Sequence, residues 1–416
     1  MRKETTFFND NFEKFYAGGD AVAELDFCED LKEIFGNKKW VRVKLGDLVF
    51  KDISCVGPLF AQSEILDKYN VYGNSLDAVF ATITDGSELG YAAGSQMMVG
   101  VMDNGKVEYH LLSTKAAEAI SGLIGSDCPG YRRASVSRKV ERLTEDIETS
   151  SDKKEVLFQI SSDTTKFDNA HGGSYVAINP AKAVYGIRDI LEEKYSNYEF
   201  KGGYYSHSVI SAKWAFPNQA DEILEIYKDY VEKKSPAMDF SDAVPTMVFY
   251  TSESGETAAT LGAYLEKDGK YRMKIGSIVK SYHKGETKEQ DIVDAAGDVF
   301  ARFRDLVAAM AELINIPIEN FVNCILNIGI GVVGINKIHV NKAVEEMKDM
   351  YGEKPTDMTA NDVFYALQTA LFNQRMSGKS DTRCDDIEEA LLKLLSPNFS
   401  WETHDTSVLD VNTGAE

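Results

Sequence analysis

Basic side chains gather in one stretch of the sequence where their spacing could hold phosphate groups. Residues 267–288 contain seven basic residues against two acidic ones. Side chains of an extended strand alternate between its faces, so Lys270, Arg272 and Lys274 would point the same way. A ridge of cations suits a nucleic-acid backbone, and Lys280 and Lys284 follow shortly along the chain. The alternative is an ordinary solvated sheet face.

A second stretch, residues 195–214, mixes aromatic with basic side chains. Aromatic rings can stack unpaired bases while neighbouring cations hold the phosphates. We expect Tyr204, Tyr205 and Trp214 to stack in this way; the alternative is that they fill a core, as strand aromatics commonly do. The predicted nucleic-acid interface therefore consists of Lys270, Arg272, Lys274, Lys280, Lys284, Tyr204, Tyr205 and Trp214.

Three glycines, Gly329, Gly331 and Gly334, match the spacing of a dinucleotide-binding loop. Such a loop needs a preceding strand and a following βαβ unit, whereas the flanking residues here have helical periodicity. We therefore expect a junction between helices, with a nucleotide site as the alternative, and we expect no cofactor.

Residues that could form a metal or nucleophilic site are scattered. The six histidines have no metal-ligand spacing, the five cysteines include no CxxC pair, and no GxSxG motif is present. We therefore expect no metal and no catalytic residues, and we favour a protein that is not an enzyme. Unpaired, widely spaced cysteines are typical of reduced thiols, which indicates a cytoplasmic location.

The charge balance limits the partners. The chain has 416 residues, with 66 acidic and 45 basic residues and a net charge of −21. That field repels anionic membranes and bulk nucleic acid, so any nucleic-acid contact requires a local basic patch. The longest apolar stretch, residues 322–335, is shorter than the roughly 20 residues of a membrane-spanning helix.

Hydrophobic periodicity indicates an α+β fold, mainly antiparallel sheets with packed helices and an all-helical C-terminal third. Residues 12–35 are expected to form a helix, and hairpins are expected at residues 97–112 and 257–279 because Asn-Gly and Asp-Gly favour tight turns. We predict an N-terminal α/β region (1–130), a linker or long loop (131–153), a central α+β region (154–290) and a helical region (291–416).

An apolar stripe occurs at helical spacing within the C-terminal region. Its members are Val299, Phe303, Leu306, Met310 and Leu313. Such a stripe must be buried. It either covers the sheet of the same chain or pairs between subunits, and we expect self-association.

Several segments together resemble a family of uncharacterised phage and plasmid proteins, a domain of unknown function. These are residues 173–180 (Gly-Ser-Tyr-Val-Ala-Ile-Asn-Pro) running into a helix, residues 211–216, residues 245–255 and the turn at residues 282–285 (Tyr-His-Lys-Gly). The resemblance covers roughly residues 150–320. It implies a phage or mobile-element setting and no particular chemistry.

These observations lead to three ranked hypotheses, with a nucleotide-dependent enzyme, which rests only on the three glycines, as a fourth. The first is a phage or mobile-element accessory protein, non-enzymatic and self-associating, that contacts single-stranded nucleic acid. The second is a virion or other structural protein. The third is an acidic inhibitor of a host protein. A host or phage protein is thus a further expected partner, a membrane is not, and the expected location is the host cytoplasm or the virion.

Overall fold

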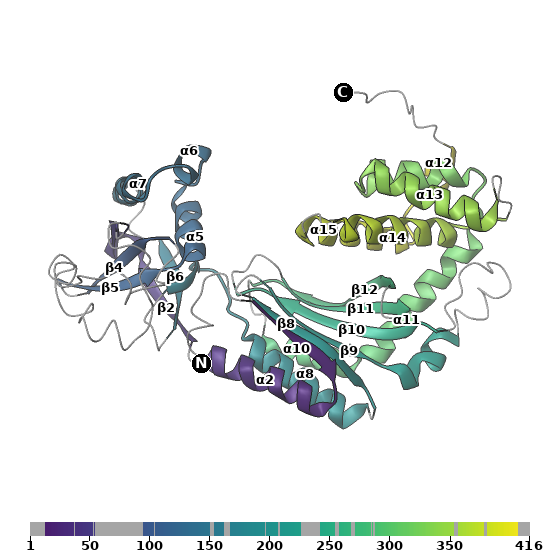
Figure 1. Cartoon of the computed structure of the whole chain (residues 1–416), viewed down its shortest axis with the longest axis horizontal. Helices are drawn as coiled ribbons and strands as arrows, with labels where there is room; N and C mark the ends of the chain where they lie inside the picture. The colour runs from purple at the N-terminus through teal and green to yellow at the C-terminus, as the bar shows by residue number, and fades with distance from the viewer. Residues whose placement is uncertain are drawn as a thin grey trace.

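The computed structural model describes most of the chain. The described residues are 13–36, 38–52, 54, 95–103, 105–149, 154–161, 167–195, 197–206, 209–225, 242–253, 258–267, 271–283, 285, 288–352, 357–377 and 381–406. They form an α+β structure with two six-stranded sheets and a helical C-terminal region, as predicted. Figure 1 shows one sheet in each of two lobes.

Sheet A is antiparallel throughout and belongs to the larger lobe. In spatial order its strands are β1 (Glu13–Gly19), β8 (Glu199–Ser206), β9 (Ile210–Ala215), β10 (Val244–Thr251), β11 (Ala259–Lys267) and β12 (Tyr271–Ser281). The β11–β12 pair is the predicted second hairpin. Along the strands of sheet A, apolar side chains on the core face alternate with mainly polar or aromatic ones on the other face.

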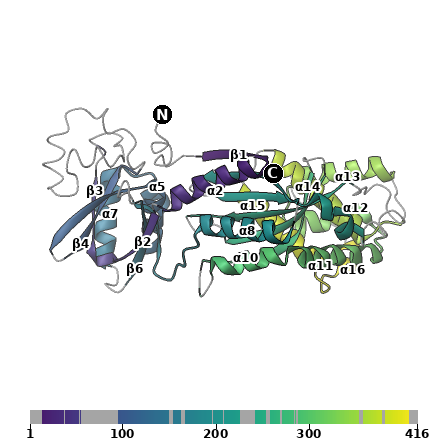
Figure 2. The same ribbon diagram turned by 90° about the horizontal axis from the view of Figure 1, so that it is seen from below.

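Helices cover the two faces of sheet A differently. The core face packs against α2 (Ala21–Gly36), α8 (Pro180–Lys194) and α10 (Glu289–Gly297), which run side by side in Figures 1 and 2. On the opposite side, α14 (Ala360–Met376) and α15 (Asp381–Leu392) lie over the β12 edge. This second face becomes more exposed towards β1: Val248 and Thr260 are buried, Tyr204 and Tyr250 are half-buried, and Phe15 is exposed. We call it the open face.

Sheet B belongs to the smaller lobe. In spatial order its strands are β2 (Lys38–Lys44), β6 (Glu155–Ser161), β7 (Phe167–Gly172), β5 (Lys106–Leu112), β4 (Met97–Asp103) and β3 (Leu48–Asp52). All pairings are antiparallel except the short contact between β5 and β7. The β4–β5 pair is the predicted first hairpin, and Gly105 takes the positive φ of 79° that its turn requires. One face of the sheet forms a separate core with α5 (Thr114–Ile124), α6 (Pro129–Arg132) and α7 (Val136–Thr149).

The chain builds the two lobes in an interleaved order. β1 and α2 belong to sheet A, residues 38–172 then supply sheet B, and the chain returns to sheet A with β8. The predicted boundary near residue 153 is therefore not a boundary between sheets, because β6 and β7 pair with strands from the N-terminal region. Local patterns in a sequence do not report such long-range strand pairing.

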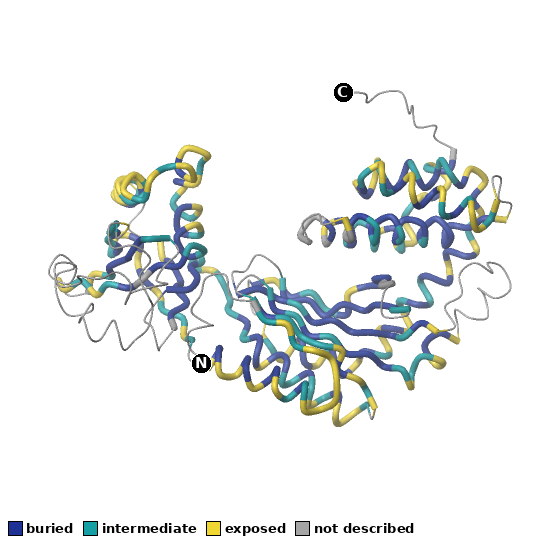
Figure 3. The backbone as a smooth tube through the Cα atoms, viewed as in Figure 1, coloured by how far each residue is buried: buried dark blue, intermediate teal, exposed yellow. Residues whose placement is uncertain are grey.

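The segment 131–153, predicted to be a linker or long loop, is mostly helical. α7 occupies Val136–Thr149, with Leu143 and Ile147 buried against the core of sheet B and Val140 packed beside them. The charges that suggested a linker lie on the solvent face of this helix, as the exposed colouring of Figure 3 shows. The apolar spacing of three and four residues was the more informative signal.

The helix predicted for residues 12–35 begins later. Residues 13–19 form the edge strand β1, and Asp20 then caps α2 by accepting hydrogen bonds from the backbone N–H groups of Val22 and Ala23. The glycine pair Gly18-Gly19 disfavours a helix at this point, and an aspartate before an apolar run is a helix-start signal.

The C-terminal region is helical from α10 onward. The remaining helices are α11 (Val299–Glu312), α12 (Phe321–Leu326), α13 (Lys337–Tyr351) and α16 (Trp401–Thr406), with short 3₁₀ turns between some of them. The three glycines lie between α12 and α13: residues Asn327–Val332 form a π-helical turn, and Gly334 has a φ of 80°. The predicted helix junction is confirmed.

The stripe on α11 is used within its own chain. Val299, Phe303, Met310 and Leu313 are buried, and Leu306 packs against Gly276 of β12. Burial of this stripe therefore gives no reason for subunits to pair. No described helix is both long and apolar enough to cross a lipid bilayer.

Candidate nucleic-acid interface

Three of the eight predicted interface residues are buried, which corrects the prediction for them. Lys274, Tyr205 and Trp214 each expose 1% of their surface or less. Trp214 and Tyr205 point into the core side of sheet A, where Trp214 Nε1 donates to Glu24 (2.6 Å) and Tyr205 Oη donates to Glu253 (3.1 Å). Neither ring can stack a base in this conformation.

Lys274 lies on the other face of sheet A, but α14 and α15 cover it. Its ammonium group is 3.5 Å from a carboxylate oxygen of Glu388 on α15 and 3.4 Å from the hydroxyl of Tyr250. The predicted alternation of the β12 side chains holds, but the ridge is not a free surface at this position. Lys270, Lys284 and the side chain of Arg272 lie outside the described residues.

The two remaining residues, Tyr204 and Lys280, lie on the open face. Cross-strand pairing connects them: Phe15 pairs with Tyr204, Tyr204 with Ser211, Ser211 with Tyr250, Tyr250 with Thr260, and Thr260 with Lys280. Directly paired residues project from the same side of a sheet. This line, which we call the open row, therefore crosses the whole of sheet A on one face.

The open row is aromatic and accessible over its first four strands. Phe15 is 75% exposed, and its ring centroid lies 4.7 Å from that of Tyr204. Ser211 and Tyr250 are half-buried, whereas Thr260 is buried. Because neighbouring strands are about 4.8 Å apart, the rings of Tyr204 and Tyr250 stand roughly 10 Å apart with only a serine between them.

Two lysines provide positive charge on the open face: Lys280 at the end of the open row, and Lys213 beside it. Lys213 lies next to Ser211 on the same face and is 2.5 Å from Glu266, while Lys280 pairs with Glu389 of α15. The Lys280 ammonium group also sits 5.4 Å from the ring centre of Tyr282, which is 61% exposed. Both lysines are partly exposed, and ion pairs of this kind contribute little to stability, so an incoming phosphate can replace their carboxylates.

A buried polar network joins sheet A to sheet B. Lys38 at the start of β2 donates to both carboxylate oxygens of Glu253 (2.8 and 2.9 Å), just after β10, and lies 3.7 Å from Asp168 on β7. Tyr205 and Asn169 also contact the Glu253 carboxylate, at 3.1 and 3.5 Å. All of these side chains are nearly inaccessible. Their polar groups bind one another, so this arrangement fits a structural joint better than a reactive centre.

An aromatic stack lies beside this network. Tyr175 stands between two imidazoles: its ring centre is 3.7 Å from that of His171 and 4.9 Å from that of His283, with interplanar angles of 8° and 9°. Burial, with a smaller contribution from the nearby imidazole of His283, lowers the pKa of His171 to about 4. His171 is therefore neutral near pH 7, which suits a ring packed at the joint between the lobes.

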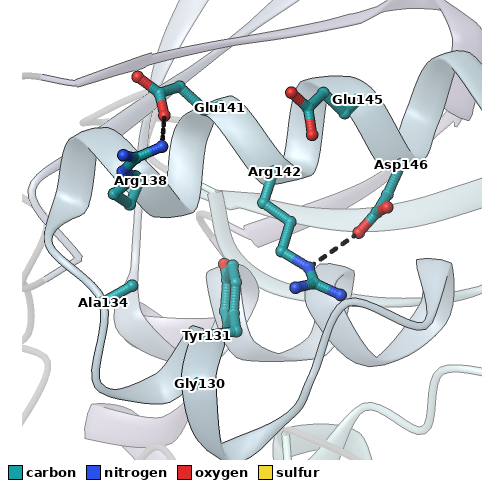
Figure 4. A pocket seen from close by; sticks show the side chains of 8 residues that line it. All are labelled: Gly130, Tyr131, Ala134, Arg138, Glu141, Arg142, Glu145 and Asp146. Atoms are coloured by element: carbon teal, nitrogen blue, oxygen red, sulfur yellow. Dashed lines mark hydrogen bonds and ion pairs between the residues drawn. The ribbon is translucent and has the colours of Figure 1, made fainter.

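Figure 4 shows a hollow between α6 and α7 in the smaller lobe, with a volume of about 530 Å³. It is lined by Gly130, Tyr131, Ala134, Arg138, Glu141, Arg142, Glu145 and Asp146. Positive and negative groups alternate along it, so it presents no uniform field for an anionic or a cationic small molecule. In the described part of the chain, no three metal-binding side chains lie close enough together to hold an ion.

Sequence reasoning missed Phe15, Ser211 and Tyr250 of the open row. Phe15 was assigned to a helix, and Tyr250 lies in a nearly continuous apolar strand where alternation is hard to see. Pairing of Tyr250 with Ser211, and of Ser211 with Tyr204, aligns residues that are up to 46 positions apart. Only the Gly-Gly-Asp signal at the start of α2 could have identified β1.

Comparison with models of protein families, with curated proteins and with solved structures finds no match to this chain. Its function therefore has to be inferred from its own geometry.

Proposed function

We propose that this protein is a non-enzymatic accessory protein of a phage or mobile element that holds single-stranded nucleic acid on the open face of sheet A. The observation that carries the proposal is the open row, in which Phe15, Tyr204 and Tyr250 share one face of sheet A on β1, β8 and β10. Rings presented by neighbouring strands form a stacking surface that does not depend on base identity. The phage or mobile-element setting in this proposal rests on the sequence resemblance alone.

The row fits a strand of unpaired bases better than a duplex. A base can stack on the Phe15–Tyr204 pair and another on Tyr250, with Lys213 beside the row and Lys280 at its end for the phosphates. The bases of a duplex are already stacked on one another, so these rings have nothing to stack against there. We therefore expect single strands to bind more tightly than duplex DNA of the same sequence.

The net charge of −21 opposes binding at long range. At physiological salt this field is screened beyond about 8 Å, whereas a phosphate in contact with a lysine is not screened to the same degree. Modest affinity and slow association are the expected result.

Replacing Lys213 with Gln should weaken binding equally across sequences and lower the salt dependence by about one released counterion.

The central experiment compares Phe15→Ala with a matched control. Phe15 is exposed, so its removal should leave the fold intact, and the loss of one stacking ring should weaken binding about 5- to 150-fold. Ile338→Ala on α13 is the control, because Ile338 is a similarly exposed apolar residue (72%) far along the chain from the row. Fluorescence anisotropy with labelled single-stranded and duplex oligonucleotides at low and physiological salt measures both effects.

Folded protein that binds neither oligonucleotide at low salt would contradict the proposal and favour the structural alternative. Equal affinities of the Phe15→Ala and Ile338→Ala variants would show that nucleic acid binds elsewhere than on the open row.

A further inference from the structure

The exposed side of α7 carries a charge pattern in which basic and acidic residues exchange places when the pattern is read in the opposite direction. Arg138, Glu141, Arg142 and Glu145 recur at helical spacing and are all exposed. A basic residue begins this stripe and an acidic residue ends it, with one of each in the middle. Residues three and four apart share a helix face, so the four side chains form one stripe.

The pattern is complementary to itself when two copies of the helix run antiparallel. With a two-fold axis between Glu141 and Arg142, Arg138 faces Glu145 of the partner subunit, and Glu141 faces Arg142 of the partner subunit. The symmetry repeats both contacts, which gives four ion pairs. In a parallel arrangement each residue would face its own copy and all four contacts would be repulsive.

We propose that α7 is a self-association surface that pairs with α7 of a second copy of this chain in an antiparallel, two-fold symmetric contact. This surface lies in the smaller lobe, outside the helical region that was expected to self-associate. The inference does not depend on nucleic-acid binding, because α7 contributes nothing to the open row.

The hollow beside α7 gives the contact its shape. It runs between the stripe and α6, where Gly130, Tyr131 and Ala134 form the opposite rim (Figure 4). A helix laid along the stripe can place long side chains in this space of about 530 Å³. Tyr131 is 5% exposed and belongs to the core of sheet B, so this side of the hollow is formed by a packed residue.

Internal ion pairs keep the stripe in order before the partner arrives. Arg138 contacts Glu141 at 3.1 Å, and Arg142 contacts Asp146 at 3.4 Å. Each guanidinium group has five N–H donors, so it can bind a second carboxylate without giving up the first. The partner's Glu145 would be that second carboxylate for Arg138.

The dimer should be weak. One helix pair buries less than the roughly 800 Å² per partner of a typical stable interface, and exposed ion pairs are individually small. Two copies with a net charge of −21 also repel each other. We expect a monomer–dimer equilibrium visible at about 100 µM protein in sedimentation velocity.

Charge exchange tests the orientation and the surface together. The Arg138→Glu/Arg142→Glu variant makes the stripe wholly acidic, and the Glu141→Arg/Glu145→Arg variant makes it wholly basic. Each variant alone should sediment as a monomer, whereas an equimolar mixture should form a one-to-one dimer. Circular dichroism shows whether like charges along α7 unfold the double variants. In that case the single variants Arg138→Glu and Glu145→Arg replace them: each alone should be a monomer, and their equimolar mixture should form the dimer.

The control is a charge exchange of Lys342 and Glu346, an exposed ion pair on α13, which should leave the dimer unchanged. A monomeric wild type at about 100 µM would overturn the inference. So would variants that dimerise like the wild type, or two monomeric variants whose mixture forms no dimer.

Discussion

At the scale of single residues, His171 shows how burial at the joint between the lobes sets a protonation state. Its imidazole is stacked on Tyr175 and lies 3.3 Å from the backbone carbonyl oxygen of Glu253. Burial lowers the pKa of His171 to about 4, so between about pH 4 and 6.5 the folded protein holds this ring in its neutral form where a free histidine would be charged.

Replacing His171 with Gln should flatten part of the pH dependence of stability. An unfolded histidine has a pKa near 6.5, so between about pH 6.5 and 4 the unfolded chain binds a proton that the folded chain does not. The wild type should therefore lose stability as the pH falls through this window, by on the order of 3 kcal/mol in total. The His171→Gln variant should lack that component.

Urea denaturation of both proteins at a series of pH values measures the difference. Titrating groups that are distant from His171 contribute equally to the two curves and cancel. Parallel curves for wild type and variant would contradict the role assigned to His171.

Tyr204 and Tyr205 show what alternation in a sequence does and does not predict. Alternation places the two rings on opposite faces of a strand, and they do lie on opposite faces. It does not say which face a helix covers, because that depends on α2, which is far away in the sequence. The prediction therefore included one accessible ring and one buried ring from the same dipeptide.

At the scale of elements, the contact between β12 and α11 anchors the helical region to sheet A. Gly276 lies directly beneath the side chain of Leu306, and a methyl group at position 276 would overlap that side chain. Only a residue without a side chain lets the helix approach the strand this closely.

The Gly276→Ala variant should be destabilised by about 1 to 3 kcal/mol, since overpacking forces the helix or the strand to move. Leu306→Ala should also be destabilising, because it leaves a cavity. In the double variant the new methyl group occupies part of that cavity. The double variant should therefore lose less stability than the two single variants lose together. Additive losses in a double-mutant cycle would show that the two positions do not contact each other.

The elements recovered from the sequence are those defined by local signals. The two hairpins, the helix junction and the helical third follow from turn residues and apolar periodicity. β1 and α7 were misassigned because each carries two conflicting local signals. In β1 the apolar residues suggested a helix despite Gly18-Gly19, and in α7 the charges suggested a loop despite Leu143 and Ile147.

At the scale of the whole molecule, the pair of Lys38 and Glu253 ties two separate cores together. Each lobe has a hydrophobic core of its own, and the buried ion pair lies where the lobes meet. The attraction between two buried charges offsets the cost of removing them from water, with little net gain in stability. Removing one charge leaves the other without a partner in a medium of low polarity.

The Lys38→Met variant should lose about 3 to 5 kcal/mol because Glu253 is left uncompensated. Adding Glu253→Gln, which removes the remaining charge, should restore part of this loss. Lys342→Met on α13, which breaks an exposed pair, should change stability by about 1 kcal/mol or less. Calorimetry should show whether the two lobes of Lys38→Met melt apart, and a loss no larger than that of Lys342→Met would argue against a buried joint.

The interleaved order of the chain has a consequence for synthesis on the ribosome. β1 leaves the ribosome before sheet B but has to wait for its neighbour β8, which is made only after all of sheet B. At typical translation speeds that delay is on the order of ten seconds. The smaller lobe can complete its own core in this interval, while β1 and the amphipathic α2 remain without their partners. A segment made before the smaller lobe is thus sequestered only after that lobe is complete, and in the meantime it is open to chaperones and to aggregation.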